Sequence, residues 1–234
     1  MKLYIIRHAD PDYENDTITE KGILEARELG KRAGSMDLTH LFTSPMGRAR
    51  ETAQYIADGS GLEPEVLNWA AELNNLYKET PFGHRPVWDI PSEYYLAPEK
   101  ISKRTSPHIA DDMPAHDEIL STMKNVGGQL DALFRGFGYR REGSRYAIES
   151  HSDAQAALVC HLGISLTMLS HLLRIPLDRA WAGFWLPPAS VTAVLMEELS
   201  DSWAVPRLVS VGDIAHLYGA GIDGNTKGLK GNIR

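Results

Sequence analysis

The chain has 234 residues, of which 43% are hydrophobic and 24% are charged, and its formal net charge is −7. These values suit a single globular α/β domain and argue against a second full domain. No stretch approaches the roughly 20 apolar residues of a membrane-spanning helix, and the acidic balance opposes non-specific binding of nucleic acid, so we expect neither a membrane nor a nucleic acid as a partner.

The cysteine content and the N-terminal sequence indicate the cellular compartment in which we expect the protein. Cys160 is the only cysteine, so it can form no internal disulfide, and its apolar surroundings in the sequence predict a small buried side chain. The N-terminus enters a strand-like run without the apolar core and cleavage site of a signal peptide. We therefore expect an unprocessed protein of the reducing cytoplasm.

The first predicted elements are a strand and a helix. Residues 2–6 form an apolar run that indicates a strand buried on both faces, as in a parallel sheet. Arg7 and His8 follow this strand directly. Thr19 suits the N-cap of a helix whose apolar residues recur at helical spacing as far as Ala33.

A second strand and helix follow. Residues 41–43 predict a short strand. Ser44 and Pro45 are typical of an N-cap and the first helical residue, which places Arg48 in the first turn of the second helix. A third strand is expected at residues 65–67.

The middle of the chain begins with an irregular segment. Residues 77–114 combine prolines, aromatic residues and mixed charges without a sustained period, so we expect an insertion over one end of the sheet. Apolar residues then recur at steps of four and three over 119–137, which indicates an amphipathic helix. Residues 156–160 predict a strand that runs into His161, and a further helix follows at once.

The remaining segments complete the predicted order. Residues 146–148 fit a short strand, and residues 190–199 and 203–211 fit two strands joined as a hairpin. The tail, residues 219–234, is rich in Gly, Lys and Asn and is expected to be flexible. Residues 1–218 are then expected to form one catalytic domain.

Histidine and arginine side chains gather where predicted strands end. His8 and His161 each follow a strand, and Arg48 lies in the first turn of a helix that follows another. Ligands of open α/β sheets bind beyond the C-terminal ends of the strands, where helix N-termini point partial positive charge. Arg7, Arg48 and the N-termini of the helices after Ser44 and His161 would surround an anion with donors, and two guanidinium groups suit a phosphoryl group.

Phosphoryl transfer to a side chain requires a nucleophile and a proton donor. A free imidazole has a pKa of about 6.5, which neighbouring arginines lower, so His8 is the candidate nucleophile. The leaving alkoxide needs a proton from a carboxyl group whose pKa is raised by burial or by an anion. Glu72 is the best candidate because it follows the third predicted strand by a few residues. His151 is a competing histidine, but we expect it on a surface loop.

Four segments resemble motifs of the histidine phosphatase superfamily, which also contains the cofactor-dependent phosphoglycerate mutases. Residues 3–9 are similar to its Arg-His-Gly signature, and residues 18–26 are similar to its Leu-Thr-x-x-Gly-x-x-Gln-Ala segment. Residues 43–53 resemble its Ser-Pro-x-x-Arg-Ala-x-x-Thr-Ala segment, and residues 159–163 resemble the segment with its second histidine. The order and the approximate spacing agree over nearly the whole chain.

The resemblance implies roles for five residues. His8 would become phosphohistidine; Arg7, Arg48 and His161 would hold the phosphate; and Glu72 would be the proton donor and later the base for water. The implied fold is a three-layer α/β/α sandwich with a mostly parallel central sheet, as in the phosphoglycerate mutases, with the irregular insertion over the active-site end. Because the sequence has no Cys, His and Asp cluster with metal-ligand spacing and no Gly-rich nucleotide loop, we expect no metal and no cofactor.

The chain departs from the family pattern at three places. Ala9 stands where glycine is usual, and the loop over residues 10–15 differs so much from the common run that Asn15 is not carried over as a ligand. The acid phosphatase branch has an aspartate directly after its second histidine. Here that position is Leu162, which favours Glu72 as the acid.

The sequence leaves three functions open. The favoured one is a phosphatase that acts on a small-molecule phosphomonoester or on a phosphorylated protein. A phosphoglycerate mutase would need an insertion that holds a diacid phosphate, and residues 77–114 offer few closely spaced basic residues beyond Lys100, Lys103 and Arg104. A catalytically silent binder of phospho-ligands is the third. The substrate and the oligomeric state stay undetermined at this level.

Overall fold

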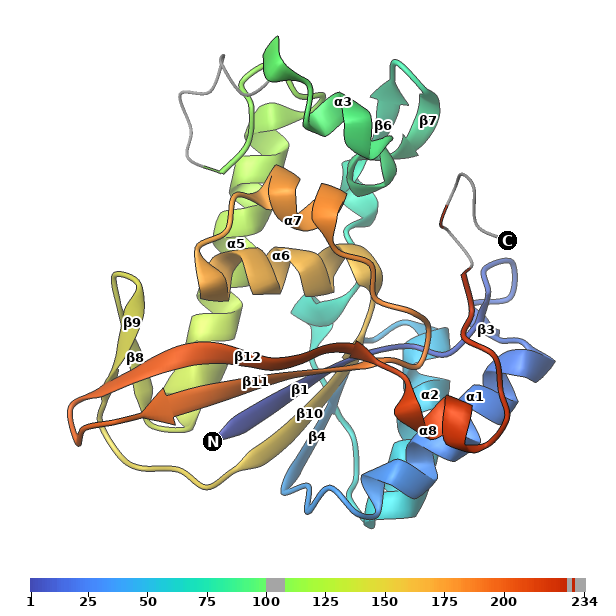
Figure 1. Ribbon diagram of the computed structural model, residues 1–234, viewed down its shortest axis with the longest axis vertical. Coiled ribbons are helices and arrows are strands. Elements are labelled where there is room, and N and C mark those ends of the chain that lie inside the picture. Colours follow the sequence, from blue (N-terminus) through green and yellow to red (C-terminus); the bar gives the residue numbers. More distant parts are fainter. Residues whose placement is uncertain (100–107, 227–228, 230–234) are drawn as a thin grey trace.

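The computed structural model describes residues 1–99, 108–226 and 229, and it shows a central sheet with helices on both faces (Figure 1). The helices are α1 (Glu20–Ala33), α2 (Gly47–Ser60), α3 (Ser92–Tyr95), α5 (His116–Gly136), α6 (Leu162–Leu173), α7 (Leu177–Gly183) and α8 (Ala215–Gly219), with 3-10 turns η1 (Asn68–Ala70), η2 (Asn74–Leu76) and η3 (Val87–Asp89). The strands are β1 (Lys2–Arg7), β2 (Pro11–Asp12), β3 (Thr17–Ile18), β4 (His40–Thr43), β5 (Glu65–Val66), β6 (Tyr77–Thr80), β7 (Gly83–Pro86), β8 (Tyr139–Glu142), β9 (Arg145–Ile148), β10 (Gln155–Cys160), β11 (Val191–Glu198) and β12 (Trp203–Asp213).

The central sheet has eight strands in the order β5-β4-β10-β1-β11-β12-β9-β8. Parallel ladders join β5, β4, β10 and β1, whereas every ladder from β1 to β8 through β11, β12 and β9 is antiparallel. The α/β class is confirmed, and the sheet is mixed rather than mostly parallel. The reason is that the last strands return as hairpins, which pair antiparallel and need no helical crossover.

The pairing of β1 with β10 places two histidines together. Arg7 is the register partner of Cys160, so the next residues along the two parallel strands, His8 and His161, leave the sheet side by side. The predicted strands at residues 2–6 and 156–160 are confirmed by β1 and β10. This end of the sheet therefore positions the site.

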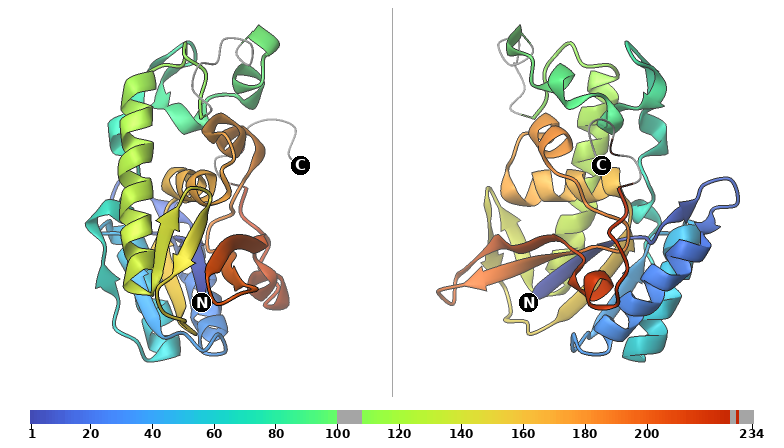
Figure 2. Two further views of the ribbon diagram at one scale, coloured as in Figure 1. Left: turned by 90° about the vertical axis from the view of Figure 1, so that its left-hand side faces the viewer. Right: turned by 45° about the vertical axis from the view of Figure 1, so that its right-hand side comes forward.

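Two apolar clusters make the three layers. Leu3 and Ile5 belong to the cluster that includes α5 and α6, and Ile6 belongs to the cluster that includes α1 and α2. Successive side chains of a strand point to opposite faces, so β1 contributes to both clusters. Figure 2 shows α1, α2 and α8 on one side of the sheet and α5 with α6 on the other.

The two N-terminal helices begin differently from each other. The N-cap of α1 is confirmed, since the Thr19 hydroxyl accepts a hydrogen bond from the Gly22 amide. For α2 the predicted start at Ser44 and Pro45 is wrong by two residues, because the N-cap is Met46 and the first helical residue is Gly47. A Cβ on Gly47 would overlap the Asp16 carbonyl oxygen, so this close approach requires glycine.

The predicted irregular segment, residues 77–114, contains a hairpin that its pattern did not predict. Strands β6 and β7 pair antiparallel, and η3 and α3 follow them. Figure 1 shows these elements beyond α6 and α7, on the side where β1 and β10 end. Trp88 and Tyr95 are buried there. Residues 100–107, with Lys100, Lys103 and Arg104, lie outside the described residues.

Part of the predicted tail contacts the domain. Helix α8 ends at Gly219, and the Asn225 side-chain amide donates a hydrogen bond of 2.5 Å to the Asp10 carboxylate. The prediction of a flexible tail over residues 227–228 and 230–234 concerns positions outside the described residues. Within the described part of the chain, no helix is both long and apolar enough to cross a membrane.

Asp131 of α5 joins three elements through its carboxylate. It accepts a hydrogen bond of 2.6 Å from the Tyr146 hydroxyl and one of 3.0 Å from His171 Nε2, and Arg141 lies 3.8 Å away. Burial alone would raise the pKa of Asp131, but the hydrogen bonds from His171 and Tyr146 and the charges of His171 and Arg141 outweigh it and hold the pKa below its ordinary value.

We expect Asp131→Asn to lower the free energy of unfolding at pH 7 by about 1–2 kcal/mol, because a charged acceptor of several hydrogen bonds is lost. A carboxyl with a lowered pKa stabilises the fold above its unfolded pKa, near 4, and this contribution is lost as the pH falls through the folded value. Urea unfolding at pH 7 and at pH 3 measures both effects. Asp201→Asn, in the exposed turn between β11 and β12, is the control. Equal stability of the two variants at pH 7 would contradict the expectation.

Candidate active site

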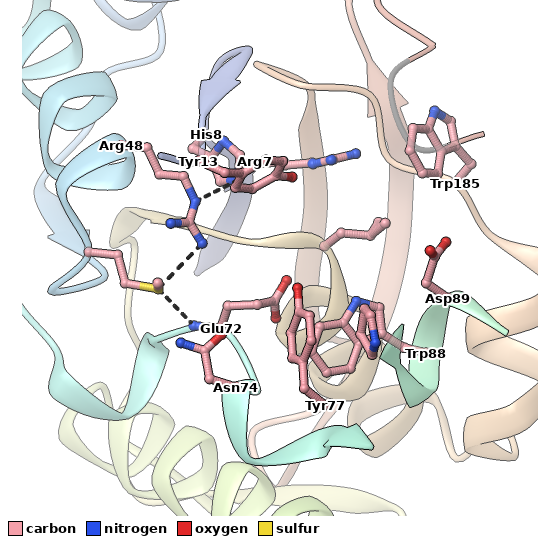
Figure 3. Close-up of a pocket in the computed structure, with 13 residues that line it drawn as sticks. Arg7, His8, Tyr13, Arg48, Glu72, Asn74, Tyr77, Trp88, Asp89 and Trp185 are labelled. Carbon is pink, nitrogen blue, oxygen red and sulfur yellow. Dashed lines mark hydrogen bonds between the residues drawn. The ribbon is translucent and has the colours of Figure 1, made fainter. Parts of the chain in front are cut away.

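Four of the predicted site residues line one cavity of about 520 Å³ beyond the C-terminal end of β1 (Figure 3). They are Arg7, His8, Arg48 and Glu72. His161 is fully buried and is not part of the cavity wall, but its ring centroid lies 5.1 Å from that of His8. The fold therefore brings all five predicted residues into one region.

The hydrogen bonds of His8 determine which of its ring nitrogens carries a lone pair. His8 Nδ1 lies 2.7 Å from the Ala9 carbonyl oxygen, which can only accept, so Nδ1 carries the proton. In a neutral imidazole Nε2 then has the lone pair. Arg48 Nε donates to this atom at 3.4 Å. The nitrogen of His8 that carries the lone pair is therefore Nε2, beside a guanidinium group.

Ser44 contacts the second histidine of the site. Burial lowers the pKa of His161 well below its ordinary value, and the charges of Arg48 and Arg7, with that of His8 whenever His8 is protonated, act in the same direction, so the ring is neutral. The Ser44 hydroxyl accepts from the Met46 amide at 3.2 Å and lies 2.7 Å from His161 Nε2, so its own proton is available to that nitrogen. When the hydroxyl donates to Nε2, the ring proton of His161 is on Nδ1, which has no hydrogen-bond partner among the described residues.

We expect Ser44→Ala to lower kcat/KM by about tenfold, which corresponds to the loss of one hydrogen bond that selects the His161 tautomer. Steady-state hydrolysis of a phosphomonoester measures the effect. Ser60→Ala, which removes a hydroxyl bonded to the Ile56 carbonyl at the end of α2, is the matched control. Activity at the parental level in Ser44→Ala would show that this hydroxyl does not orient His161.

The two arginines are held in different ways. Arg7 is buried, donates to the Leu186 carbonyl oxygen at 2.7 Å and lies 4.8 Å from the centre of the Trp185 ring. Its Nε has no hydrogen-bond partner among the described residues. Burying such a cation costs free energy unless an anion pairs with it. Burial lowers the pKa of Arg7, although Tyr13 and Glu72 act in the opposite direction.

Arg48 is anchored by Asp16, a residue that the sequence did not identify. Arg48 Nη1 lies 2.6 Å from one carboxylate oxygen of Asp16, and the Gly47 amide donates to the other at 2.7 Å. Asp16 has a positive φ of 49°, in the left-handed region. Nothing in the local sequence indicates this conformation, because it depends on how the short loop before β3 returns to α2.

Glu72 occupies the N-terminus of α6. Its carboxyl oxygens accept hydrogen bonds from the amides of Gly163 and Ile164, both at 3.0 Å, and from its neighbour Leu73 at 3.1 Å. Burial raises the pKa of Glu72 and outweighs these three hydrogen bonds, which favour the ionised form. A raised pKa is what a proton donor needs near neutral pH.

Carboxylates already occupy several amides of the two helix N-termini that were expected to face an anion. The N-terminal amides of α6 bind the Glu72 carboxyl, and that of Gly47 in α2 binds Asp16. Carboxylates satisfy these amides, as they do in capped helices. The positive charge that a ligand meets in the cavity wall therefore comes mainly from Arg7 and Arg48.

Aromatic residues complete the cavity wall. Tyr77 and Trp88 come from the 77–114 segment, which we expected over one end of the sheet, and both line the cavity. Tyr13 and Trp185 were not predicted, and Tyr13 lies with its ring 5.3 Å from the Arg48 guanidinium carbon. His151 is exposed and contacts Glu198 and Asp153 rather than the cavity, as the surface interpretation predicted.

Comparisons with known proteins point to one family. Residues 3–82 match the sequence profile of the histidine phosphatase superfamily (branch 1). The chain is 25% identical to Probable phosphoglycerate mutase GpmB of Escherichia coli, with 95% of this chain and 98% of that protein covered. The GpmB protein of Enterobacter sp. (strain 638) is similar to the same extent.

Solved structures share the fold. Phosphoserine phosphatase of Entamoeba histolytica in complex with 3-phosphoglyceric acid is 19% identical, with a TM-score of 0.63 over 92% of this chain and 98% of that chain. The mycobacterial glucosyl-3-phosphoglycerate phosphatase is also 19% identical, with a TM-score of 0.58 over 90% and 98%. The profile match, the full-length relatives and the shared fold agree with the order of the motifs. The chain is similar to the histidine phosphatase superfamily, branch 1, over residues 3–82, and its relatives and its fold agree with that similarity.

Proposed function

We propose that this enzyme is a metal-independent phosphatase that hydrolyses phosphomonoesters through a phosphohistidine intermediate on His8. The observation that carries the proposal is the hydrogen bond from His8 Nδ1 to the Ala9 carbonyl oxygen, because it leaves the lone pair on Nε2 at the cavity. Attack by a neutral imidazole needs no metal ion to generate the nucleophile.

The proposed reaction has two steps. In the first, His8 Nε2 bonds to phosphorus while the bond from phosphorus to the ester oxygen breaks, and Glu72 gives its proton to that oxygen. In the second, water bonds to phosphorus as the bond to Nε2 breaks, and Glu72 takes a proton from the water. Arg7, Arg48 and the Nδ1 proton of His161 balance the charge on the phosphoryl oxygens.

A mutase reaction is the second candidate, because the E. coli and Enterobacter relatives are named as probable phosphoglycerate mutases. The cavity supports the phosphatase instead. Of the described residues that line it, only Arg7 and Arg48 carry a permanent positive charge, and Arg48 is paired with Asp16. If the phosphoryl group occupies these two arginines, no further arginine or lysine among the described wall residues is left for the carboxylate of a phosphoglycerate.

A silent phospho-ligand binder is the third candidate. It would keep the arginines without needing an unprotonated nucleophile or a carboxyl with a raised pKa. The tautomer of His8 and the burial of Glu72 support turnover instead. We also propose that residues 1–218 form the catalytic domain and that the segment 77–114 forms part of the wall of its cavity.

The test is the release of inorganic phosphate from a panel of phosphomonoesters in the presence of a chelator. We expect hydrolysis that the chelator does not reduce, together with an acid-labile, base-stable phosphoryl group on the protein after a rapid basic quench. Interconversion of phosphoglycerates without phosphate release would identify a mutase. Phosphate binding with neither reaction would identify a silent binder.

A further inference from the structure

A second cavity continues the active site away from His8. It has a volume of about 590 Å³ and shares four wall residues with the catalytic cavity. These are Trp88, Asp89, Leu162 and Trp185. Figure 3 shows the labelled Trp88, Asp89 and Trp185 on the side of the catalytic cavity away from Arg48. A group attached to a phosphate at Arg7 and Arg48 can therefore extend into this second space.

The walls of the second cavity are mainly aromatic and aliphatic. Besides the shared tryptophans it is lined by Trp181 and Phe184 from the region of α7, and by Ile90 and Leu166. Large, apolar walls with few polar groups favour the burial of a flat apolar ligand, and aromatic rings pack against one another in offset or edge-on arrangements.

Trp88 is a rigid part of this wall. A Cβ on Gly163, in the first turn of α6, would lie 2.7 Å from the Trp88 ring, so the indole packs directly against the helix backbone. The Tyr77 ring meets it edge-on, with 5.6 Å between centroids. A side chain fixed in this way loses little freedom when a ligand binds, which strengthens binding.

The charged groups of the second cavity disfavour acids. Among the described residues of its wall, Asp89 and Glu93 contribute two carboxylates, and Arg85 contributes one guanidinium, which donates to the Asp89 carbonyl oxygen at 3.3 Å. Asp89 also belongs to the wall shared with the catalytic cavity. Among the described wall residues the carboxylates outnumber the guanidinium groups, so an acidic leaving group is the less favoured occupant.

We propose that the substrate is the phosphate monoester of a bulky aromatic alcohol that carries no carboxylate. The phosphate lies at Arg7 and Arg48, and the aromatic group occupies the second cavity beside Trp88 and Trp181. The assignment rests on the proposed phosphatase function of the same site. It distinguishes this chain from an enzyme for small acidic esters such as phosphoglycerates.

The test measures binding without turnover. Calorimetric titration of the parent protein compares naphthylmethylphosphonate, methylphosphonate and phosphonoacetate, which carry an aromatic, a minimal and an acidic group. We expect the naphthyl compound to bind at least about tenfold more tightly than methylphosphonate, and phosphonoacetate to bind no better than methylphosphonate. Equal affinities, or tighter binding of phosphonoacetate, would overturn the assignment.

A pair of glycine variants locates the aromatic group. Gly183 is the last residue of α7 and lies in the wall of the second cavity, and an added Cβ meets no atom within 4 Å. Gly136 is the last residue of α5 and is equally open, but it does not line this cavity. We expect Gly183→Leu to reduce the preference for naphthylmethylphosphonate over methylphosphonate several-fold, and Gly136→Leu to leave that preference unchanged. A parental preference in Gly183→Leu would place the aromatic group elsewhere and overturn the assignment.

The outcome for the substrate class is separable from the outcome for the reaction. If the naphthyl compound binds selectively but the protein hydrolyses no phosphomonoester, the proposed phosphatase function fails and the ligand class stands. If the protein hydrolyses phosphoserine or phosphoglycerate faster than naphthyl phosphate, the reaction stands and the ligand class fails.

Discussion

Replacement of His8 by alanine is expected to lower kcat for phosphomonoester hydrolysis by at least about 10⁴-fold, because it removes the atom that forms the covalent intermediate. No other imidazole lines the cavity among the described residues, and the His161 ring is buried behind it. Phosphate should still bind to the variant, since Arg7 and Arg48 remain. Phosphate release measures the loss of kcat, and a basic quench for phosphohistidine measures the loss of the covalent intermediate.

His151→Ala is the matched control for the His8 substitution. It removes the same side chain from an exposed loop, where the ring contacts Glu198 and Asp153. We expect activity within about twofold of the parent, as for surface substitutions away from the site. Retention of more than a tenth of the parental kcat by His8→Ala would show that another group carries the phosphoryl transfer.

Apolar periodicity in the sequence predicts the parts of the fold that are buried. The strands that became β1, β4 and β10 and the helix that became α5 are predicted because their apolar residues must face a core on one or both sides. Strands β6 and β8 were missed. Their sequences, Tyr77–Thr80 and Tyr139–Glu142, are mostly polar and pair at the surface with β7 and β9, so no apolar alternation marks them.

The site residues also divide into those that the sequence predicts and those that it does not. His8, Arg48 and His161 follow buried strands directly or through one helix turn, so the topology of the sheet predicts their meeting. Asp16 and Ser44 act through contacts between segments that only the folded chain brings together. Ser44 was predicted as an N-cap, and the structure instead uses its hydroxyl at His161, because two residues of extended chain precede α2.

Replacement of Glu72 by glutamine is expected to have an effect that depends on the leaving group. For alkyl phosphates we expect kcat to fall by about 10²–10⁴-fold, because an alkoxide cannot leave without a proton. For 4-nitrophenyl phosphate the first step needs no proton donor, so a burst of about one nitrophenolate per enzyme should survive. The second step still lacks a base for water, and phosphohistidine should therefore accumulate on His8.

The pH dependence gives an independent measure of the same carboxyl. Burial raises the pKa of Glu72, so its proton is retained to a higher pH than that of an ordinary glutamate. In the parent, turnover of an alkyl phosphate limited by the first step should fall as the pH rises through this pKa, because the donor is lost. In Glu72→Gln this decrease of the rate with rising pH should disappear.

Glu25→Gln separates the chemistry of Glu72 from the general effect of changing a buried glutamate. Glu25 is fully buried, burial raises its pKa, and it accepts a hydrogen bond of 2.8 Å from the Asp10 amide, but it does not line the catalytic cavity. We expect Glu25→Gln to change the rates for alkyl and nitrophenyl esters by the same factor. If Glu72→Gln also affected both esters equally and left no burst, Glu72 would be a structural cap of α6 and a different group would supply the proton.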